Sequence, residues 1–335
     1  MLGHGPKLMP RHDLGKRIAL DTPVPAGQSS RVDIPRAAAA LVAAAALLPA
    51  GARAQSAVAA DLWRVAAGTH ATPAALAREG SAALWTPAAT LGPAEPSLRL
   101  AVETIHSPAE AGVSGSVAAA SARTKSGWTL SAVYGRLSIS DLVRTETSPE
   151  ALGNIPAFAQ VLSVGAARAV LVPGLAGGIA LRALSARLDD RLEGRWALDA
   201  GLTYARPHVR VGAATQFLAP RTATSAPGAS LLLGAEARTG ETELLGTLGT
   251  VAVRYGTSIA DGEAPSHLLS AGVALAGAFE VDVGAAREAV AGDAVWRSRF
   301  GAAVAAGRYR VCLGRDGGVH GFGATYRFGL AASFR

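Results

Sequence analysis

Cysteine is almost absent from this sequence, whose 335 residues include only Cys312. An internal disulfide is therefore excluded. Signatures of metal and nucleotide sites are missing as well, because the sequence contains no HExxH, no CxxC and no Gly-rich phosphate loop. We therefore expect no metal and no cofactor, and we interpret Cys312 as a small buried or lipid-facing residue.

Long apolar runs are also absent from most of the chain, although 50% of the residues are hydrophobic and only 17% are charged. After residue 54, charges and turn residues interrupt every apolar stretch before it reaches 18 residues. Helical membrane spans are therefore not expected. Hydrophobicity spread this thinly fits the many short strands of a membrane barrel better.

A shorter apolar run, residues 37–49, follows Arg31 and Arg36 and precedes the small-residue sequence Ala52-Arg53-Ala54. Its length falls short of the roughly 20 residues that a membrane-spanning helix needs. The pattern predicts a signal peptide that is cleaved before Gln55, so that residues 1–54 form a leader and the mature protein is exported.

Excess positive charge lies mostly in this leader. The whole chain carries +7, residues 1–54 contribute +4, and the remaining 281 residues carry +3. Lys125 is the only lysine after the leader, and no basic stripe is visible. We therefore expect no nucleic-acid partner.

The C-terminal residues 326–335 alternate apolar and polar side chains to the very end. Because strand side chains point to opposite faces with period 2, one face would carry Tyr326, Phe328 and Phe334. A soluble edge strand could show the same alternation. In an exported, Gly-rich chain we interpret it as the closing strand of an outer-membrane barrel, and these three aromatics as the assembly signal for the barrel assembly machinery.

Similar alternation divides residues 97–335 into about fourteen strands, with twelve or sixteen as alternatives. Long or charged connections alternate with short ones, as in bacterial barrels with long extracellular loops and short periplasmic turns. The sequence thus predicts an all-β fold, a transmembrane antiparallel β-barrel of about 14 strands in contact with outer-membrane lipid. The predicted strands are 97–106, 112–123, 127–140, 158–171, 174–188, 194–205, 208–218, 227–238, 245–258, 266–276, 278–290, 294–305, 307–315 and 319–335.

Charges within these strands fall on one parity, which indicates a polar lumen, since a charge on the lipid face costs about 2–4 kcal/mol at the midplane. A closed polar network is the commoner role for such residues, and a binding site is the alternative. The residues predicted to line the lumen are Arg182, Asp199, Arg210, Gln216, Glu236, Arg254, Glu280 and Asp282. On the opposite parity, the residues expected to face lipid include Trp196, Leu198, Val209, Val211, Phe217, Val253, Phe279 and Val283.

The segment before the barrel, residues 55–96, differs from the strands. Thr72 and Pro73 resemble an N-cap followed by Pro at the first helical position, and residues 74–84 are rich in Ala. We expect a short helical plug or periplasmic arm here.

The order of these features resembles the PorV/PorQ proteins of the FadL-like outer-membrane superfamily. Those proteins carry an Asn-Pro-Ala motif after small residues and an aromatic, and Thr86 stands where the Asn would be. The resemblance implies a fourteen-stranded barrel with an N-terminal plug, used for uptake of hydrophobic molecules or in type IX secretion. It rests on residues 80–88 (GSAALWTPA), 177–182 (GGIALR), 197–204 (ALDAGLTY) and 211–214 (VGAA).

No nucleophile, base and orienting group occur together as a local motif, so we do not expect an enzyme. A lipid hydrolase, an autotransporter domain and a soluble sandwich are weaker alternatives. The sequence therefore predicts a non-enzymatic outer-membrane barrel in transport or type IX secretion, with secretion-system proteins as its partners. The alternative is a FadL-like channel for a hydrophobic ligand. A channel would need an apolar pocket and an opening beside the plug, whereas the lumen of a scaffold can be filled.

Overall fold

The computed structural model describes residues 58–78, 80–89, 97–108, 112–140, 142–144, 153–170, 172–218, 229–260, 263–290, 293–318 and 323–334, which all belong to one compact unit. The predicted leader, residues 1–54, lies outside them.

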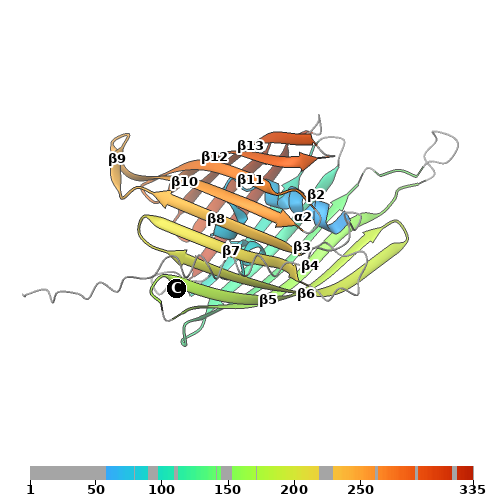
Figure 1. Ribbon diagram of the computed structural model, residues 1–335, viewed down its shortest axis with the longest axis horizontal. Helices are drawn as coiled ribbons and strands as arrows, with labels where there is room; N and C mark the ends of the chain where they lie inside the picture. Colours follow the sequence, from blue (N-terminus) through green and yellow to red (C-terminus); the bar gives the residue numbers. More distant parts are fainter. Residues whose placement is uncertain are drawn as a thin grey trace, which may run out of the picture. The chain divides into compact units, whose positions relative to one another are not determined.

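Fourteen strands each pair antiparallel with the strand before and the strand after them in the barrel. The pairing of β10 with β11 and of β15 with β1 makes the sheet a closed ring. The prediction of a fourteen-stranded barrel is therefore confirmed, and counts of twelve and sixteen are wrong. Figure 1 shows the strands side by side and tilted. They are β1 Leu98–His106, β2 Val113–Arg123, β3 Trp128–Ile139, β4 Ala157–Ala169, β5 Leu175–Leu188, β6 Arg191–Ala205, β7 Val209–Leu218, β8 Ser230–Arg238, β10 Thr247–Ala260, β11 Ser266–Leu275, β12 Phe279–Val290, β13 Asp293–Ala306, β14 Tyr309–Asp316 and β15 Thr325–Phe334.

The two ends of the barrel differ in their connections. One end carries the tight turns after β2, β4, β6, β11 and β13, and we call it the short-turn mouth. The start of β1 and the end of β15 also lie there, since Leu98 pairs with Phe334. The other end, the long-loop mouth, carries the connections 107–112, 140–156 and 219–229, but also a two-residue turn at 189–190 and the two-residue connection between β12 and β13.

One predicted short turn is instead a hairpin extension. Strand β9, Thr242–Leu244, pairs with the start of β10 and projects from the short-turn mouth (Figure 1). The last strand is Thr325–Phe334 and does not include residues 323–324, while residues 319–322 of its predicted span lie outside the described residues. Both differences lie at the end of a strand, where an alternating pattern predicts the boundary least accurately.

Alternate residues of the strands face outward and are apolar. In β10, for example, Val253 and Tyr255 are exposed while Arg254 between them is buried. Strand side chains alternate in this way because successive Cβ atoms point to opposite faces of the sheet. The barrel therefore has an apolar outer surface and an inner surface that holds the charges.

The N-terminal segment forms a plug, residues 58–89, that packs against the inner surface of the barrel. Its elements are α2 (Val58–Gly68), the 3-10 turn η1 (Ala74–Leu76) and the single helical turn α3 (Ala82–Trp85). The Ala-rich stretch 74–84 contains η1 and the start of α3, which are separate because the chain is extended at Ala77 (ψ 137°). Among the described residues, no helix is long and apolar enough to span a membrane.

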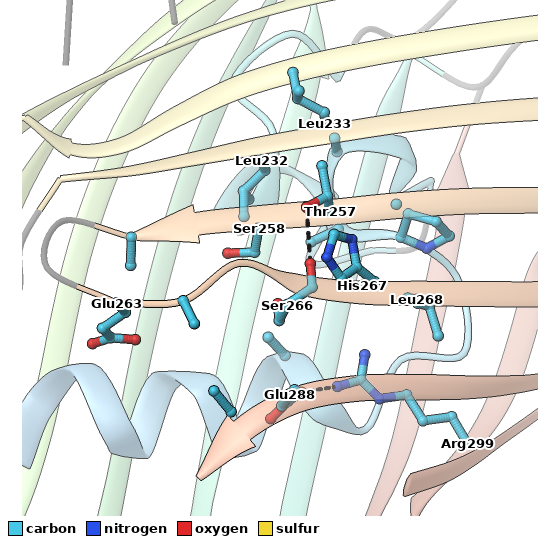
Figure 2. A pocket seen from close by; sticks show the side chains of 18 of the residues that line it. Leu232, Leu233, Thr257, Ser258, Glu263, Ser266, His267, Leu268, Glu288 and Arg299 are labelled. Atoms are coloured by element: carbon cyan, nitrogen blue, oxygen red, sulfur yellow. Dashed lines mark hydrogen bonds and ion pairs between the residues drawn. The ribbon is translucent and has the colours of Figure 1, made fainter. Parts of the chain in front are cut away.

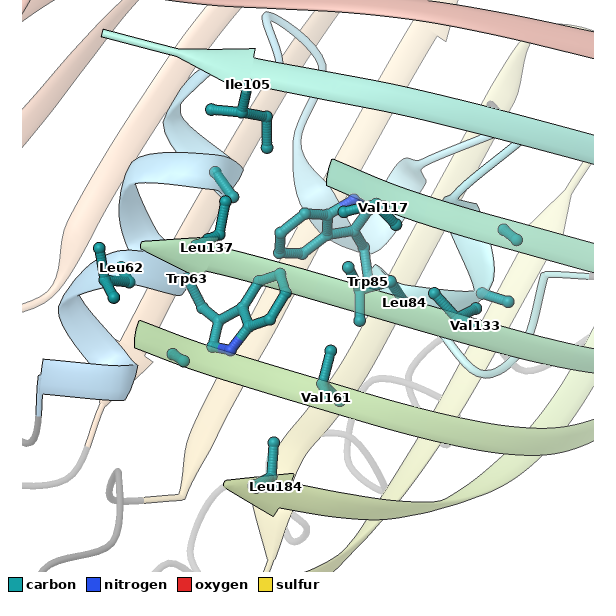
Figure 3. Close-up of a cluster of buried hydrophobic side chains, with 14 of the residues drawn as sticks. Leu62, Trp63, Leu84, Trp85, Ile105, Val117, Val133, Leu137, Val161 and Leu184 are labelled. Carbon is teal, nitrogen blue, oxygen red and sulfur yellow. The ribbon is translucent and has the colours of Figure 1, made fainter. Parts of the chain in front are cut away.

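The plug and the wall share one apolar core (Figure 3). Trp63, Leu84 and Trp85 of the plug are each at most 5% exposed, and they pack with inward side chains such as Val117 and Leu137. Burying a side chain of this size contributes about 1.5–3 kcal/mol. The plug is therefore part of the hydrophobic core.

Candidate functional site

The lumen is the candidate site, and glycines determine how closely the plug approaches its wall. A Cβ added to Gly178, Gly212 or Gly314 would lie 2.1, 2.3 and 2.2 Å from the carbonyl oxygens of residues 87, 75 and 69 of the plug. Real Cβ atoms do not come within 3.0 Å of such atoms. Only glycine therefore permits this close approach of two backbones.

Three further glycines face plug side chains in the same way. Their added Cβ atoms would lie 2.6 to 2.7 Å from Trp63, Leu76 and Pro73. We call the set the glycine belt; its members are Gly135, Gly178, Gly212, Gly234, Gly256 and Gly314. They come from six strands, so the plug rests on the wall at several points around the barrel.

Arg182 and Asp199, both predicted to line the lumen, form a fully buried ion pair between β5 and β6. Arg182 also donates a hydrogen bond to the carbonyl oxygen of Leu84. Gln216 Nε2 donates to the same carbonyl oxygen at 3.1 Å and to that of Trp85 at 3.2 Å. Wall side chains thus satisfy carbonyl groups at the end of α3 that the short helix leaves open.

Phe217 was predicted to face lipid, and this prediction is wrong. The register shifts between Leu198 and Ala200, so that Gln216 and Phe217 of β7 together oppose Asp199 of β6. This β-bulge turns both side chains inward. Phe217 has φ 59°, its N–H donates to Asp199 Oδ1 at 2.8 Å, and its ring lies 5.2 Å from the Arg182 guanidinium.

Arg254 is the centre of a second buried network. Its Nε donates to Glu236 Oε2 at 2.6 Å, its Nη1 pairs with Asp282, and its Nη2 lies 3.6 Å from Glu280 Oε1. Asp282 lies two strands away, and Gly272 on the intervening strand leaves the space that the pair occupies. The network lies where the sequence predicted polar lumen residues.

This network extends into the plug. Arg78 Nη2 lies 3.2 Å from Glu236 Oε1, so both oxygens of Glu236 accept from arginines. On the other side, Arg310 donates to Glu280 Oε2 at 2.7 Å. Arg210 is also buried, and its Nη2 donates to the Ala77 carbonyl oxygen at 3.4 Å.

Two further groups of charges were missed by the sequence reasoning. Arg297 and Arg299 of β13 both pair with Glu288 and Asp316 of the two flanking strands near the long-loop mouth. These arginines are two residues apart and so share a strand face, which is the signal that could have identified them.

The second missed group joins the plug to the closing strands. Ser81 Oγ of the plug donates to Glu103 Oε1 of β1 at 2.7 Å, and Arg327 Nη1 of β15 lies 3.5 Å from Glu103 Oε2. All three residues are buried. Arg327 lies between Tyr326 and Phe328 in the sequence, so the alternation of a strand places its side chain on the inner face. This pattern could have identified the group.

Two cavities lie at opposite mouths. The first has about 130 Å³ and opens near the long-loop mouth, where Figure 2 shows His267, Glu288 and Arg299 around it. The second has about 400 Å³ and lies at the short-turn mouth, with Arg78 and Arg210 in its lining. The plug contributes residues to both. Among the described residues, no group of three or more His, Cys, Asp or Glu side chains is placed to hold a metal ion.

The C-terminal strand β15 pairs with β14 on one side and β1 on the other. Tyr326 and Phe328 are exposed on its outer face, and Phe334 is half-buried with the Arg308 guanidinium 5.4 Å from its ring. The aromatics that were interpreted as an assembly signal therefore lie on the strand that closes the barrel.

Comparison with known proteins found no matching family model and no match among curated proteins. Among solved structures, the Ralstonia pickettii toluene transporter TbuX is 14% identical over 77% of this chain and 94% of its own, with a TM-score of 0.49. The Acinetobacter baumannii outer-membrane protein Omp33 is 9% identical over 72% and 99%, with a TM-score of 0.43. A mutant of the Rh. blastica porin is 12% identical over 72% and 99%, with a TM-score of 0.36.

Proposed function

We propose that this chain is a non-enzymatic barrel of the bacterial outer membrane, exported through a cleaved signal peptide. The apolar outer face and the closed ladder support this proposal, because a closed barrel leaves no unpaired sheet edge in lipid. Aromatic side chains also lie outward near both mouths, Trp196 and Trp296 toward the long loops and Trp128 and Tyr309 toward the short turns. Such rings favour the two membrane interfaces.

Within that class we propose a PorV/PorQ-type scaffold associated with secretion. The observation that carries this proposal is the contact between the two parts of the resemblance. Thr86, Pro87 and Ala88 of the plug lie against the mid-barrel glycines, since an added Cβ on Gly201 would lie 3.0 Å from Ala88 N and one on Gly178 2.1 Å from Pro87 O. The Thr-Pro-Ala segment of the plug and the glycine-containing strands of the wall are thus in direct contact.

A seated plug suits a scaffold better than an open pore. The glycine belt brings the plug into backbone contact with the wall, and hydrogen bonds from Arg182 and Gln216 hold α3. The partners of such a scaffold protein would be outer-membrane lipid, the barrel assembly machinery and secretion-system proteins.

A FadL-like channel is the second candidate, and the cavities on either side of the plug favour it. Movement of the plug could join them. Their linings contain Arg78, Arg210, Glu288 and Arg299, so a polar solute fits them better than the hydrophobic ligand that the family resemblance implies.

Two measurements separate the candidates. Quantitative proteomics of the culture medium would compare a strain that lacks this protein with the same strain carrying a wild-type copy. We expect the deletion to remove a set of secreted proteins that share a C-terminal sorting domain. Planar-bilayer recordings of the purified protein should show no steady conductance. An unchanged secretome together with a steady conductance would reject the scaffold and favour the channel.

A further inference from the structure

Among the described residues that line the cavity at the short-turn mouth, all of the charged ones are arginines. Its volume is about 400 Å³, within the range of small-molecule pockets, and four arginines contribute to its lining: Arg78, Arg99, Arg210 and Arg238. None of the described residues that line it is acidic. Hydroxyl groups of Ser121 and Thr203 add polar groups to the wall.

Arg210 is the residue that requires an explanation. Its side chain is only 7% exposed, and its Nη2 makes a long hydrogen bond of 3.4 Å to the Ala77 carbonyl oxygen. Among the described residues, no carboxylate lies within 4.0 Å of its guanidinium. Placing a charge in such a site without a partner is costly, so an anionic partner would stabilise it.

The nearest candidate partner within the wall is already occupied. Glu236 faces Arg210 across the β7–β8 ladder, but its two oxygens accept from Arg78 and Arg254. The contrast with Arg254 is informative, because Arg254 has three carboxylates around it. Arg210 thus retains donors and is part of the lining of a cavity whose other described charged residues are arginines.

The other arginines differ in exposure. Arg78 has a side chain 51% exposed although it pairs with Glu236, so it lies at the rim of the cavity. Arg238 uses its Nε to donate to the Pro207 carbonyl oxygen at 2.7 Å, which leaves the two terminal amino groups of its fork. A ligand that enters from the mouth would meet Arg78 and Arg238 before it reaches Arg210.

We propose that this cavity binds a small solute through an oxyanion group, a phosphate monoester or phosphate, with Arg210 as its buried contact and Arg238 as a second one. Guanidinium groups match the geometry of such oxygens in a bidentate fork. The volume admits the anion together with a small organic part, but not a folded partner. This site goes beyond the proposed function, since a scaffold and a channel could both carry it.

Isothermal titration of the full-length protein in maltoside detergent tests the proposal, with glycerol 3-phosphate as the ligand at low salt. We expect saturable binding that weakens as salt increases. Arg210→Gln and Arg238→Gln should each weaken it about tenfold or more, the loss of a charged hydrogen bond. The matched control is Arg191→Gln, which removes the same charge at the opposite mouth and should leave the affinity unchanged.

Heat-modifiable mobility on a gel establishes that each variant is a folded barrel, and Arg238→Gln keeps the test valid if the buried substitution fails to fold. Absence of saturable binding to the wild-type protein, or equal affinities in all four proteins, would overturn the proposal. A second titration uses short-chain phosphatidylglycerol below its micelle concentration. If only this lipid binds, the small-solute proposal is wrong and the cavity holds a lipid headgroup; the failure of either titration leaves the secretion proposal unaffected.

Discussion

The glycine belt makes the position of the plug sensitive to a single methyl group. In Gly178→Ala, the new Cβ would lie 2.1 Å from the carbonyl oxygen of Pro87, 2.6 Å from its carbonyl carbon and 2.9 Å from Ala167 Cβ. The first two are backbone atoms that cannot rotate away, so either the wall or the plug has to move. Overpacking of this kind costs about 1–3 kcal/mol, and we expect the upper end of that range.

The assay is urea unfolding in detergent, followed by the heat-modifiable mobility of the barrel, together with limited trypsin digestion. We expect the free energy of unfolding to fall by about 3 kcal/mol, or the plug to leave the wall and become cleavable. The control is Gly194→Ala, where the nearest atom to the new Cβ is 3.8 Å away. If Gly178→Ala and Gly194→Ala match the wild type in stability and cleavage, the plug does not rest on the wall as described.

The buried charges, the outer face and the C-terminal strand each give one further prediction. Arg182→Met leaves Asp199 buried without its partner and should lower the free energy of unfolding by about 3–5 kcal/mol, while the double variant with Asp199→Leu should recover much of that loss in the same urea assay. Val253→Arg places a charge on the outer face and should cost about 2–4 kcal/mol, whereas Leu245→Arg at the exposed tip beside β9 should cost almost nothing; equal costs would refute the orientation of the faces. Deletion of residues 334–335 should reduce the amount of heat-modifiable barrel in isolated outer membranes, and normal assembly of that variant would argue against the C-terminal signal.

The strands could be predicted from the sequence because each one alternates over ten or so residues. Charges such as Arg254 and Asp282 were placed on the inner face by parity alone. Their pairing could not be predicted, since it depends on the register of three strands and on the space that Gly272 leaves between them. Parity tells which face a side chain occupies, but it does not identify the partner.

Phe217 shows where such reasoning fails. A strict period of two places it outward, but one extra residue in β7 reverses the parity at that point. The positive φ of Phe217 is a conformation that costs of order 1–3 kcal/mol for a residue with a side chain. Contacts with Asp199 and Arg182 offset it, and a pattern read along one strand does not contain them.

The close fit of plug and wall also constrains the order of assembly. Because wall glycines lie directly against plug carbonyl groups, the seated plug leaves no room even for a methyl group at these contacts. Such a fit forms most directly when the plug is in place while the sheet is still open. Ser81 then meets Glu103 of the first strand, and Glu103 meets Arg327 of the last, so the seam that closes the barrel is sealed by contacts that include the plug. Pairing of β1 with β15 would thus be most favourable when the plug is already inside the barrel.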